Sequence, residues 1–380
     1  MPLKPKAQSL KPEPLSLLCE GAGALVVNDP SDAPAARVRR PRYAGKNPRR
    51  FDEKYKELDP ARYPSDVQKV LASGKTPAGT HRPIMVAEVL ECVRPAAGEI
   101  AVDCTLGGGG HARALLERLQ PGGRLIGMDV DPVELPRTEA LLRAAGYGPD
   151  ACRVHHANFA GLPRILAAEG LGAADIIVAD LGVSSMQLDD PARGFSYKDA
   201  GPLDMRMNPL RGEPAWELLA RVSEEALAAL LVENADEPQA DEIARWLKAH
   251  PVHTSHALEA LVRTELTTAH PELTKAEVKL SVRRTFQALR IAVNDELAVL
   301  DSLLRMLPYC LAPGGRTAIL TFHSGEDRRV KKAFQAGARE GVYSSVAADV
   351  IRSTKDELLA NRRAQAAKLR WAVRASTFAL

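Results

Sequence analysis

The chain has 380 residues, of which 45% are hydrophobic and 26% charged, with a formal net charge of +3. This length suits one large domain with an insertion, or two domains. No apolar run approaches the ~20 residues of a membrane-spanning helix, so we expect no membrane partner. The five cysteines are scattered and odd in number and form no C-x-x-C pair, which predicts reduced thiols and a cytoplasmic location.

The first 80 residues are predicted to be a basic, Pro-rich N-terminal extension. Within it, residues 37–56 contain nine Lys or Arg residues, with Tyr43, Phe51 and Tyr55 among them. Such a stretch can bind phosphates and stack on unpaired bases. The alternative is a solvated tail. An organelle presequence is a further alternative, against which Glu13 and Glu20 count.

From His81 the sequence alternates between strand and helix patterns. Apolar runs predict strands at residues 100–103, 124–129, 152–156 and 175–181, with helical patterns between them. This alternation predicts a parallel sheet with helices on both faces.

The alternation stops after the fourth strand. Residues 182–212 form a polar loop, and residues 214–277 show helical patterns only. One long helix is then predicted over residues 286–307, followed by strands at 316–322 and 369–373. We therefore divide the chain into an extension (1–80), a first core part (81–212), an inserted helical subdomain (213–284) and a second core part (285–380).

The first predicted strand leads into four glycines, Gly107 to Gly110, and then into a helix. Glycines allow close approach of a ligand to the backbone, and a helix N-terminus favours an anionic group. Asp129 ends the next strand, where an acid can accept hydrogen bonds from ribose hydroxyls. The spacing of these glycines differs from the G-x-G-x-x-G pattern of dinucleotide-binding proteins. An acid before the turn, here Asp103, is more typical of S-adenosylmethionine (SAM) methyltransferases. A turn that serves only helix packing is the alternative.

Four polar side chains fall at the carboxyl ends of predicted strands: Asp103, Asp129, Asp180 and His323. Ligands of open parallel sheets bind outside these ends. Asp180 also opens a Gly- and Ser-rich loop, and an acid there can face a cofactor's methyl group and orient a target amine. The sequence thus predicts one site at this sheet edge.

Several longer motifs resemble the MraW (RsmH) family of 16S ribosomal RNA cytosine-N4 methyltransferases. The resemblance covers about residues 81–375 and leaves the extension uncovered. It rests on the following segments, in this order: the glycine turn, 180–185 (DLGVSS), 193–195 (RGF), 201–207 (GPLDMRM), 284–297 (RTFQALRIAVNDEL) and 322–324 (FHS). Departures from the family pattern occur at Met186, at Gly325 and at residues 233–238.

The resemblance implies a Rossmann-like class I SAM-dependent methyltransferase fold, with a mostly parallel seven-stranded sheet and an inserted helical subdomain. It also implies methylation of the N4 amine of cytosine 1402 in the decoding centre, with 16S rRNA of the small ribosomal subunit as partner. A homodimer is compatible with it. The implied SAM contacts are Gly109, Gly110, His111, Asp129, Phe159, Asp180 and Gln187. For catalysis we favour Asp180, with Asp204 and His323, together with Arg206, as secondary candidates.

Other chemistries have less support in the sequence. His250, His253 and His256 do not predict a metal site, because Pro251 interrupts the helix and no further ligand completes the set. Cys104 is expected to pack beside the glycine turn rather than to act as a nucleophile. The open alternatives are a methyltransferase acting on another RNA site or on protein, a nucleotide-binding dehydrogenase, and a non-catalytic RNA-binding assembly factor.

Overall fold

The computed structural model describes residues 83–377. The predicted extension, with its basic stretch at residues 37–56, lies outside the described residues, as does Cys19.

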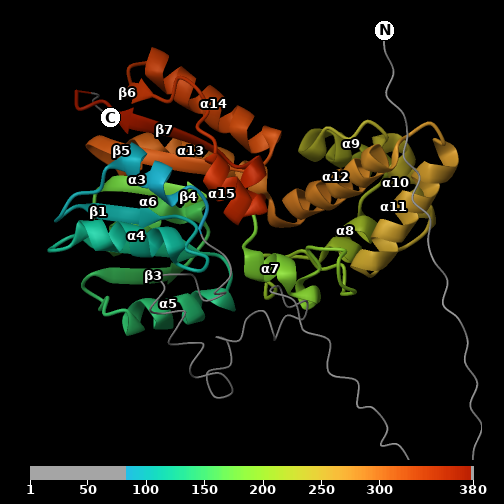
Figure 1. The fold of residues 1–380 in the computed structure, drawn as a ribbon, viewed down its shortest axis with the longest axis horizontal. Helices are drawn as coiled ribbons and strands as arrows, with labels where there is room; N and C mark the ends of the chain where they lie inside the picture. The colour runs from blue at the N-terminus through green and yellow to red at the C-terminus, as the bar shows by residue number, and fades with distance from the viewer. Residues whose placement is uncertain (1–82, 378–380) are drawn as a thin grey trace, which may run out of the picture. The chain divides into compact units, whose positions relative to one another are not determined.

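Seven strands form one sheet in the order β3–β2–β1–β4–β5–β7–β6 (Figure 1). The first five pair in parallel, whereas β7 runs antiparallel to both β5 and β6. The predicted mostly parallel seven-stranded sheet is therefore confirmed, although the apolar pattern had not located β6. The strands are β1 Ile100–Asp103, β2 Arg124–Asp129, β3 Cys152–His156, β4 Ala174–Asp180, β5 Leu311–Thr321, β6 Tyr343–Val346 and β7 Lys368–Arg374.

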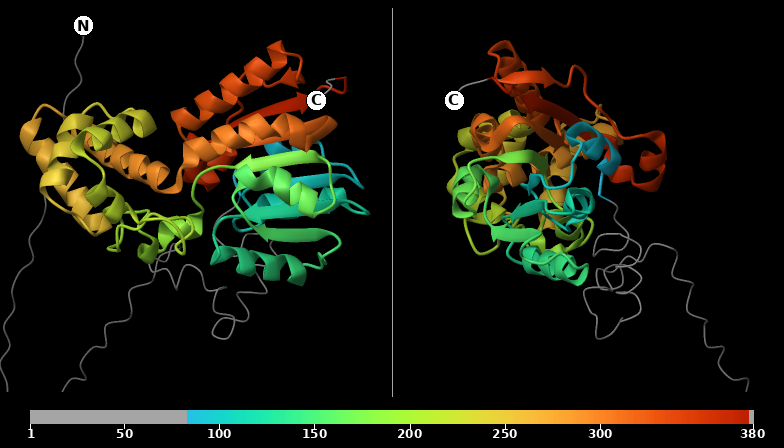
Figure 2. Two further views of the ribbon diagram at one scale, coloured as in Figure 1. Left: turned by 180° about the vertical axis from the view of Figure 1, so that it is seen from behind. Right: turned by 90° about the vertical axis from the view of Figure 1, so that its left-hand side faces the viewer.

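Helices cover both faces of the sheet. One face packs on α3 (Val86–Val93), α4 (Gly110–Leu119) and α5 (Glu134–Ala144). The other packs on α6 (Leu162–Ala168), α13 (Glu296–Cys310) and α14 (Ser324–Arg339), and Figure 2 shows α6 and α13 over this face from behind. Side chains of a strand alternate between faces, so Ile176 and Val178 of β4 join the first core and Ile177 and Ala179 the second. This explains why β4 is apolar throughout.

Between β4 and β5 the chain forms a separate helical bundle with its own apolar core. Two short elements lie between β4 and this bundle: α7 (Ser185–Asp189) and the 3-10 turn Pro191–Arg193. A further short helix, α15 (Lys355–Ala360), follows β6. The bundle helices are α8 Ala215–Arg221, α9 Glu224–Ala235, α10 Ala240–Ala249, α11 Ser255–Ala269 and α12 Lys275–Asn294.

The single long helix predicted over residues 286–307 is wrong, because the structure has two helices there. Asp295 adopts a left-handed conformation (φ 51°) and both ends α12 and begins α13. The apolar period continues across the break, which is why the sequence pattern did not reveal it. The domain boundary predicted between residues 284 and 285 falls inside α12, whose Phe286 and Leu289 pack in the bundle core. We propose Asp295 as the boundary.

No helix within residues 83–377 is both long enough and apolar enough to cross a bilayer. The same residues contain no group of three or more His, Cys, Asp or Glu side chains arranged to bind a metal ion. Cys92, Cys104, Cys152 and Cys310 are free thiols.

Candidate active site

A cavity of about 430 Å³ lies at the carboxyl ends of β1, β2 and β4. Its volume is in the range of roughly 300–1,000 Å³ typical of small-molecule sites. In the sheet order, β1 neighbours both β2 and β4, so the chain winds away from this point in opposite directions. Such a switch point is where open α/β sheets bind ligands. The loop 181–188 and residues of α12 and α13 complete the wall.

The glycine turn is fixed to β2 by Asp129. The carboxylate of Asp129 accepts a hydrogen bond from the Gly107 N–H (2.7 Å) and another from the Asp131 N–H (2.9 Å). Burial raises the pKa of Asp129. Gly110 lies on the cavity wall, whereas Gly109 packs against α5, since a Cβ there would lie 2.9 Å from Thr138 Cγ2. Gly109 is left-handed (φ 75°) and precedes α4, which favours glycine for conformational reasons.

Asp180 stands at the end of β4, on the cavity wall. Its backbone N–H donates to Thr105 Oγ1 (2.6 Å), which ties β4 to the turn after β1. Its Oδ1 atom is buried and has no hydrogen-bond donor among the described residues. Burial raises the pKa of Asp180 to about 7, and the negative charge of Glu326 adds to this effect. The carboxyl therefore lacks a donor and sits near its protonation midpoint at neutral pH.

Two further ionisable groups adjoin Asp180. His111 Nδ1 lies 3.7 Å from Asp180 Oδ2, while His111 Nε2 contacts the Ile84 carbonyl oxygen at 2.9 Å. Because a carbonyl only accepts, we assign the ring proton to Nε2. Burial lowers the pKa of His111, so the ring is neutral at pH 7. Burial also raises the pKa of Asp103 to about 6.

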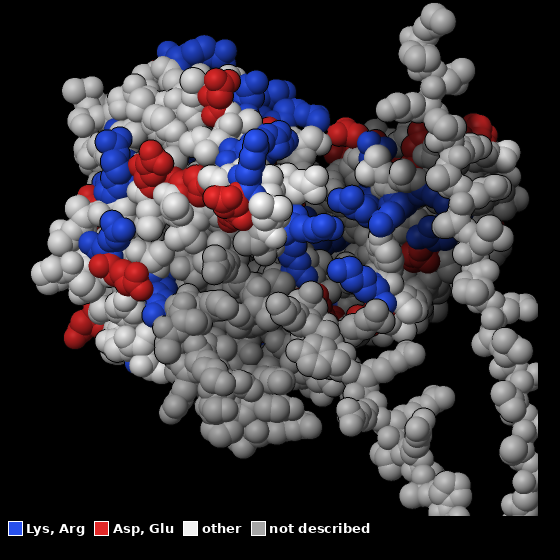
Figure 3. All heavy atoms as spheres, viewed as in Figure 1, with Lys and Arg blue, Asp and Glu red and all other residues white. Residues whose placement is uncertain are grey.

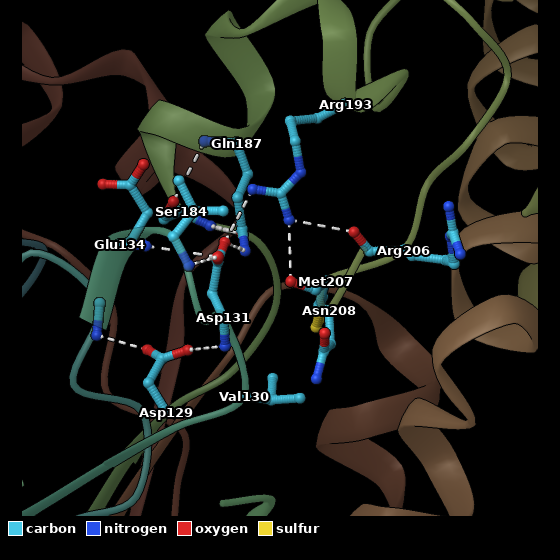
Figure 4. Close-up of polar contacts among 12 residues, drawn as sticks. Asp129, Val130, Asp131, Glu134, Ser184, Gln187, Arg193, Arg206, Met207 and Asn208 are labelled. Atoms are coloured by element: carbon cyan, nitrogen blue, oxygen red, sulfur yellow. Dashed lines mark hydrogen bonds and ion pairs between the residues drawn. The ribbon is translucent and has the colours of Figure 1, made fainter. Parts of the chain in front are cut away.

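A buried polar network links the turn after β2 to the loop after β4 (Figure 4). Asp131, 1% exposed, accepts hydrogen bonds from Gln187 Nε2 (2.7 Å) and Arg193 Nη1 (2.8 Å). Arg193 Nη2 also donates to the carbonyl oxygens of Arg206 (3.0 Å) and Met207 (2.8 Å). Gln187 additionally caps α7 by exchanging hydrogen bonds with Ser184. The loop after β4, through Gln187 and Arg193, thus meets the turn after β2 at the Asp131 carboxylate.

Six of the residues predicted from the sequence lie on the cavity wall: Gly110, His111, Asp129, Phe159, Asp180 and Gln187. His323 and Asp204 do not line it. His323 caps the N-terminus of α14 reciprocally with Glu326, and Asp204 forms an ion pair with Arg206 (2.7 Å).

The sequence analysis does not single out several polar wall residues, among them Thr105, Asp131, Arg290, Asn294 and Glu326. Most of these residues lie close in sequence to a predicted site residue or within a family motif. Asp131 follows Asp129 by two positions, and Arg290 and Asn294 stand inside the motif at 284–297. Glu326 lies three residues beyond His323, on the first turn of α14.

A comparison with protein-family models matches residues 78–375 to the MraW methylase family. The chain belongs to this family. The predicted family is therefore confirmed.

Three relatives carry names that agree with this family. The protein of Alkaliphilus metalliredigens named ribosomal RNA small subunit methyltransferase H 2 is 47% identical over 344 residues, which covers 89% of this chain and 98% of the relative. The protein of Agathobacter rectalis named ribosomal RNA small subunit methyltransferase H 1 is 46% identical, covering 89% and 97%. That of Lachnoclostridium phytofermentans with the same name is 45% identical, covering 89% and 93%. The chain is accordingly a methyltransferase.

Proposed function

We propose that this chain transfers a methyl group from SAM to the N4 amine of cytosine 1402 in small-subunit ribosomal RNA. The observation that carries the proposal is the carboxyl of Asp180, which faces the cavity and has no donor for its buried Oδ1. The Asp180 side chain is 30% exposed, so an exocyclic amine in the cavity can donate to this carboxyl. The names of the relatives support the class of RNA.

The residues at the turn after β1 and β2 fit SAM. Gly107, Gly108 and Gly110 leave the wall without side chains at the start of α4, where unpaired N–H groups favour a carboxylate. The Asp129 carboxylate accepts from the Gly107 and Asp131 N–H groups, and a carboxylate has about four acceptor positions, which leaves capacity for a ribose hydroxyl. Phe159 provides an apolar surface for the adenine. When bound, SAM supplies an electrophilic methyl group on a positively charged sulfur.

Asp180 is proposed to hold the amine. The N4 lone pair is delocalised into the cytosine ring, so the amine is a weak nucleophile. A hydrogen bond from N4–H to the carboxylate orients the nitrogen and stabilises the positive charge that develops on it. When N4 takes the methyl group, the bond from that carbon to the sulfonium sulfur breaks, sulfur leaves as a neutral thioether, and the surplus amine proton passes to the carboxylate. A carboxyl with a pKa of about 7 is well matched to accept and then release a proton near neutral pH.

The RNA surface is expected beside the cavity. On the face shown in Figure 3, Lys and Arg side chains gather right of centre, where α8 and α12 lie in Figure 1. Helix α12 carries five basic residues and one acidic residue, and Lys275, Lys279 and Arg283 are exposed. The same helix contributes Arg290 to the cavity wall. A basic surface of this kind attracts the RNA backbone, and the target base must leave its stack to enter the cavity.

The proposal is tested by single-turnover methyl transfer to small ribosomal subunits that lack the modification, at saturating SAM. We expect N4-methylcytidine in the nucleoside digest and a rate about 10²–10³ lower for Asp180→Asn, the usual cost of one lost transition-state contact. Asp175→Asn, at the opposite end of β4, is the matched control and should keep the wild-type rate. A carbon-methylated product, or an unchanged rate for Asp180→Asn, would contradict the proposal.

A further inference from the structure

We infer that Asp131 and Arg193 couple the two halves of the cavity, so that a ligand at the turn after β2 also orders the loop that carries Met207. This inference rests on the proposed function in taking SAM as the occupant of that turn. Neither residue is assigned to the chemistry, and both act through the backbone that they position. Figure 4 shows Arg193 between Asp131 on one side and the backbone of Arg206 and Met207 on the other.

Asp131 is fixed to the cofactor side. Its Oδ1 accepts a hydrogen bond from the Val133 N–H (2.9 Å) at the start of α5, and its own N–H donates to Asp129 Oδ1 (2.9 Å). Any ligand that hydrogen-bonds the Asp129 carboxylate therefore contacts the group that also holds Asp131. The remaining oxygen, Oδ2, is left for Gln187 and Arg193.

Arg193 is fixed to the opposite side. Its planar guanidinium uses Nη1 for Asp131 and Nη2 for two successive carbonyl groups, those of Arg206 and Met207. Its own carbonyl accepts from the Met205 N–H (3.0 Å). A lysine could not span these partners, because a single ammonium lacks the fork of a guanidinium.

Met207 is a wall residue held from two directions. On the side away from Arg193, its N–H donates to Asn294 Oδ1 (2.7 Å), and Asn294 Nδ2 donates to the Met205 carbonyl (2.7 Å). Asn294 belongs to the last turn of α12, beside the break at Asp295. The position of Met207 therefore depends on the turn after β2 and on the end of the helical bundle together.

The burial of the pair suggests a role other than stability. The Asp131 and Arg193 side chains are 1% and 10% exposed. Buried ion pairs often add little net stability, because the cost of removing both charges from water offsets their attraction. The geometry that this pair imposes on the loop is a better explanation of its presence. Loss of one partner frees the loop and leaves a buried charge. Coupling between two sites is reciprocal, so a loop that is ordered by the cofactor must in turn strengthen cofactor binding.

The test measures hydrogen exchange of the peptide that covers residues 203–212 in the full-length protein, with and without S-adenosylhomocysteine. In the wild type we expect the ligand to slow exchange about tenfold, within the ~5–150-fold range of typical coupling. Arg193→Gln and Asp131→Asn should reduce the effect below threefold and weaken ligand affinity by a similar factor. Arg193→Lys should restore part of the affinity and little of the protection.

Arg221→Gln is the matched control, because it removes the exposed ion pair with Glu213 near the same loop and should leave the ligand effect unchanged. Ligand binding to the wild type without any change in loop exchange overturns the inference and spares the proposed function. This comparison needs no variant, so a misfolded mutant cannot obscure it. Full coupling in a folded Arg193→Gln protein also overturns the inference. Failure of S-adenosylhomocysteine to bind the wild type overturns both proposals.

Discussion

The Asp180 carboxyl lies against the imidazole of His111, with Oδ2 3.7 Å from Nδ1. In the assigned tautomer His111 Nε2–H donates a hydrogen bond to the Ile84 carbonyl oxygen, so the nitrogen that faces Asp180 carries a lone pair and not a proton. A neutral His111 therefore cannot satisfy the carboxylate. When Asp180 is protonated, however, its O–H can be directed towards Nδ1, and the remaining carbonyl oxygen is a neutral, weaker acceptor that cannot take up the amine proton. The protonation state of Asp180 thus controls its proposed role.

The first prediction concerns pH and rate. Burial and Glu326 raise the pKa of Asp180 to about 7, and only the ionised carboxyl can take up the amine proton. The single-turnover rate of the wild type should therefore rise with pH and level off above a midpoint at or below about 7. Asp180→Asn should show no such rise. A wild-type profile that is flat between pH 5.5 and 8 would remove Asp180 as the titrating group.

The second prediction concerns pH and stability. The carboxyl has a higher pKa when folded than when unfolded, where it is about 3.9. The folded state then binds more protons between these values, so stability is fully present below pH 4 and is lost as pH rises through about 7. Asp180→Asn should unfold like the wild type at pH 4 but be more stable at pH 8. The side chain is 30% exposed, so we discount the gain to about 1 kcal/mol. Denaturant titration at both pH values measures this difference, and a variant less stable than the wild type at pH 8 would contradict the assigned direction.

The third prediction concerns the cofactor. Asp129→Asn should weaken SAM binding at least about tenfold, because a hydrogen bond to a charged group contributes roughly 1.5–3 kcal/mol and tenfold is about 1.4 kcal/mol. Calorimetry measures the affinity. Glu139→Gln, on the exposed side of α5, serves as control and should bind like the wild type. Equal affinity in a folded Asp129→Asn protein would place SAM elsewhere.

The sequence predicted the cavity wall where residues stand next to a strand end. Asp129 and Asp180 follow apolar runs directly, and parallel strands bring such ends together. It did not predict the wall residues that arrive from afar. Arg290 and Asn294 come from α12, more than 100 residues after β4, and nothing in a local pattern shows which helix face meets the sheet. His323 stands at a strand end as well but caps α14 and does not line this cavity, so its candidate role stays a prediction.

The fold shows the same limit. Apolar runs located β1, β2 and β4 because most residues of these strands are buried. In β6, by contrast, one buried residue, Tyr343, precedes two exposed serines, and the strand is only four residues long. The break between α12 and α13 depends on Asp295, whose left-handed backbone is compatible with an uninterrupted apolar period on both sides. The Arg290–Glu296 ion pair (2.8 Å) spans this junction.

The fourth prediction concerns the loop that carries Met207. Gly194 and Gly212 both have positive φ angles (71° and 74°), so alanine causes similar backbone strain at each. Their surroundings differ, because a Cβ at Gly194 would lie 2.2 Å from the Pro202 carbonyl oxygen, whereas one at Gly212 meets nothing within 4 Å. Gly194→Ala should therefore lower both stability and methyl transfer, while Gly212→Ala should cost only about 1 kcal/mol of stability. Thermal unfolding and single-turnover rates compare the two, and equal effects would show that the contact with Pro202 is unimportant.

The fifth prediction separates amine methylation from carbon methylation. Methylation at C5 of cytosine needs a thiolate nucleophile, and Cys104 is the only described cysteine on the cavity wall. Burial raises the pKa of Cys104 well above its usual value, so the thiol stays protonated and inert. Cys104→Ala should therefore retain methyl transfer within about threefold and lose about 1 kcal/mol of stability through the small cavity. Cys310→Ala, a buried thiol of the same core away from the cavity, should behave alike. A 100-fold loss confined to Cys104→Ala, or a covalent complex with RNA containing 5-fluorocytosine, would instead favour a cysteine mechanism over the proposed role of Asp180.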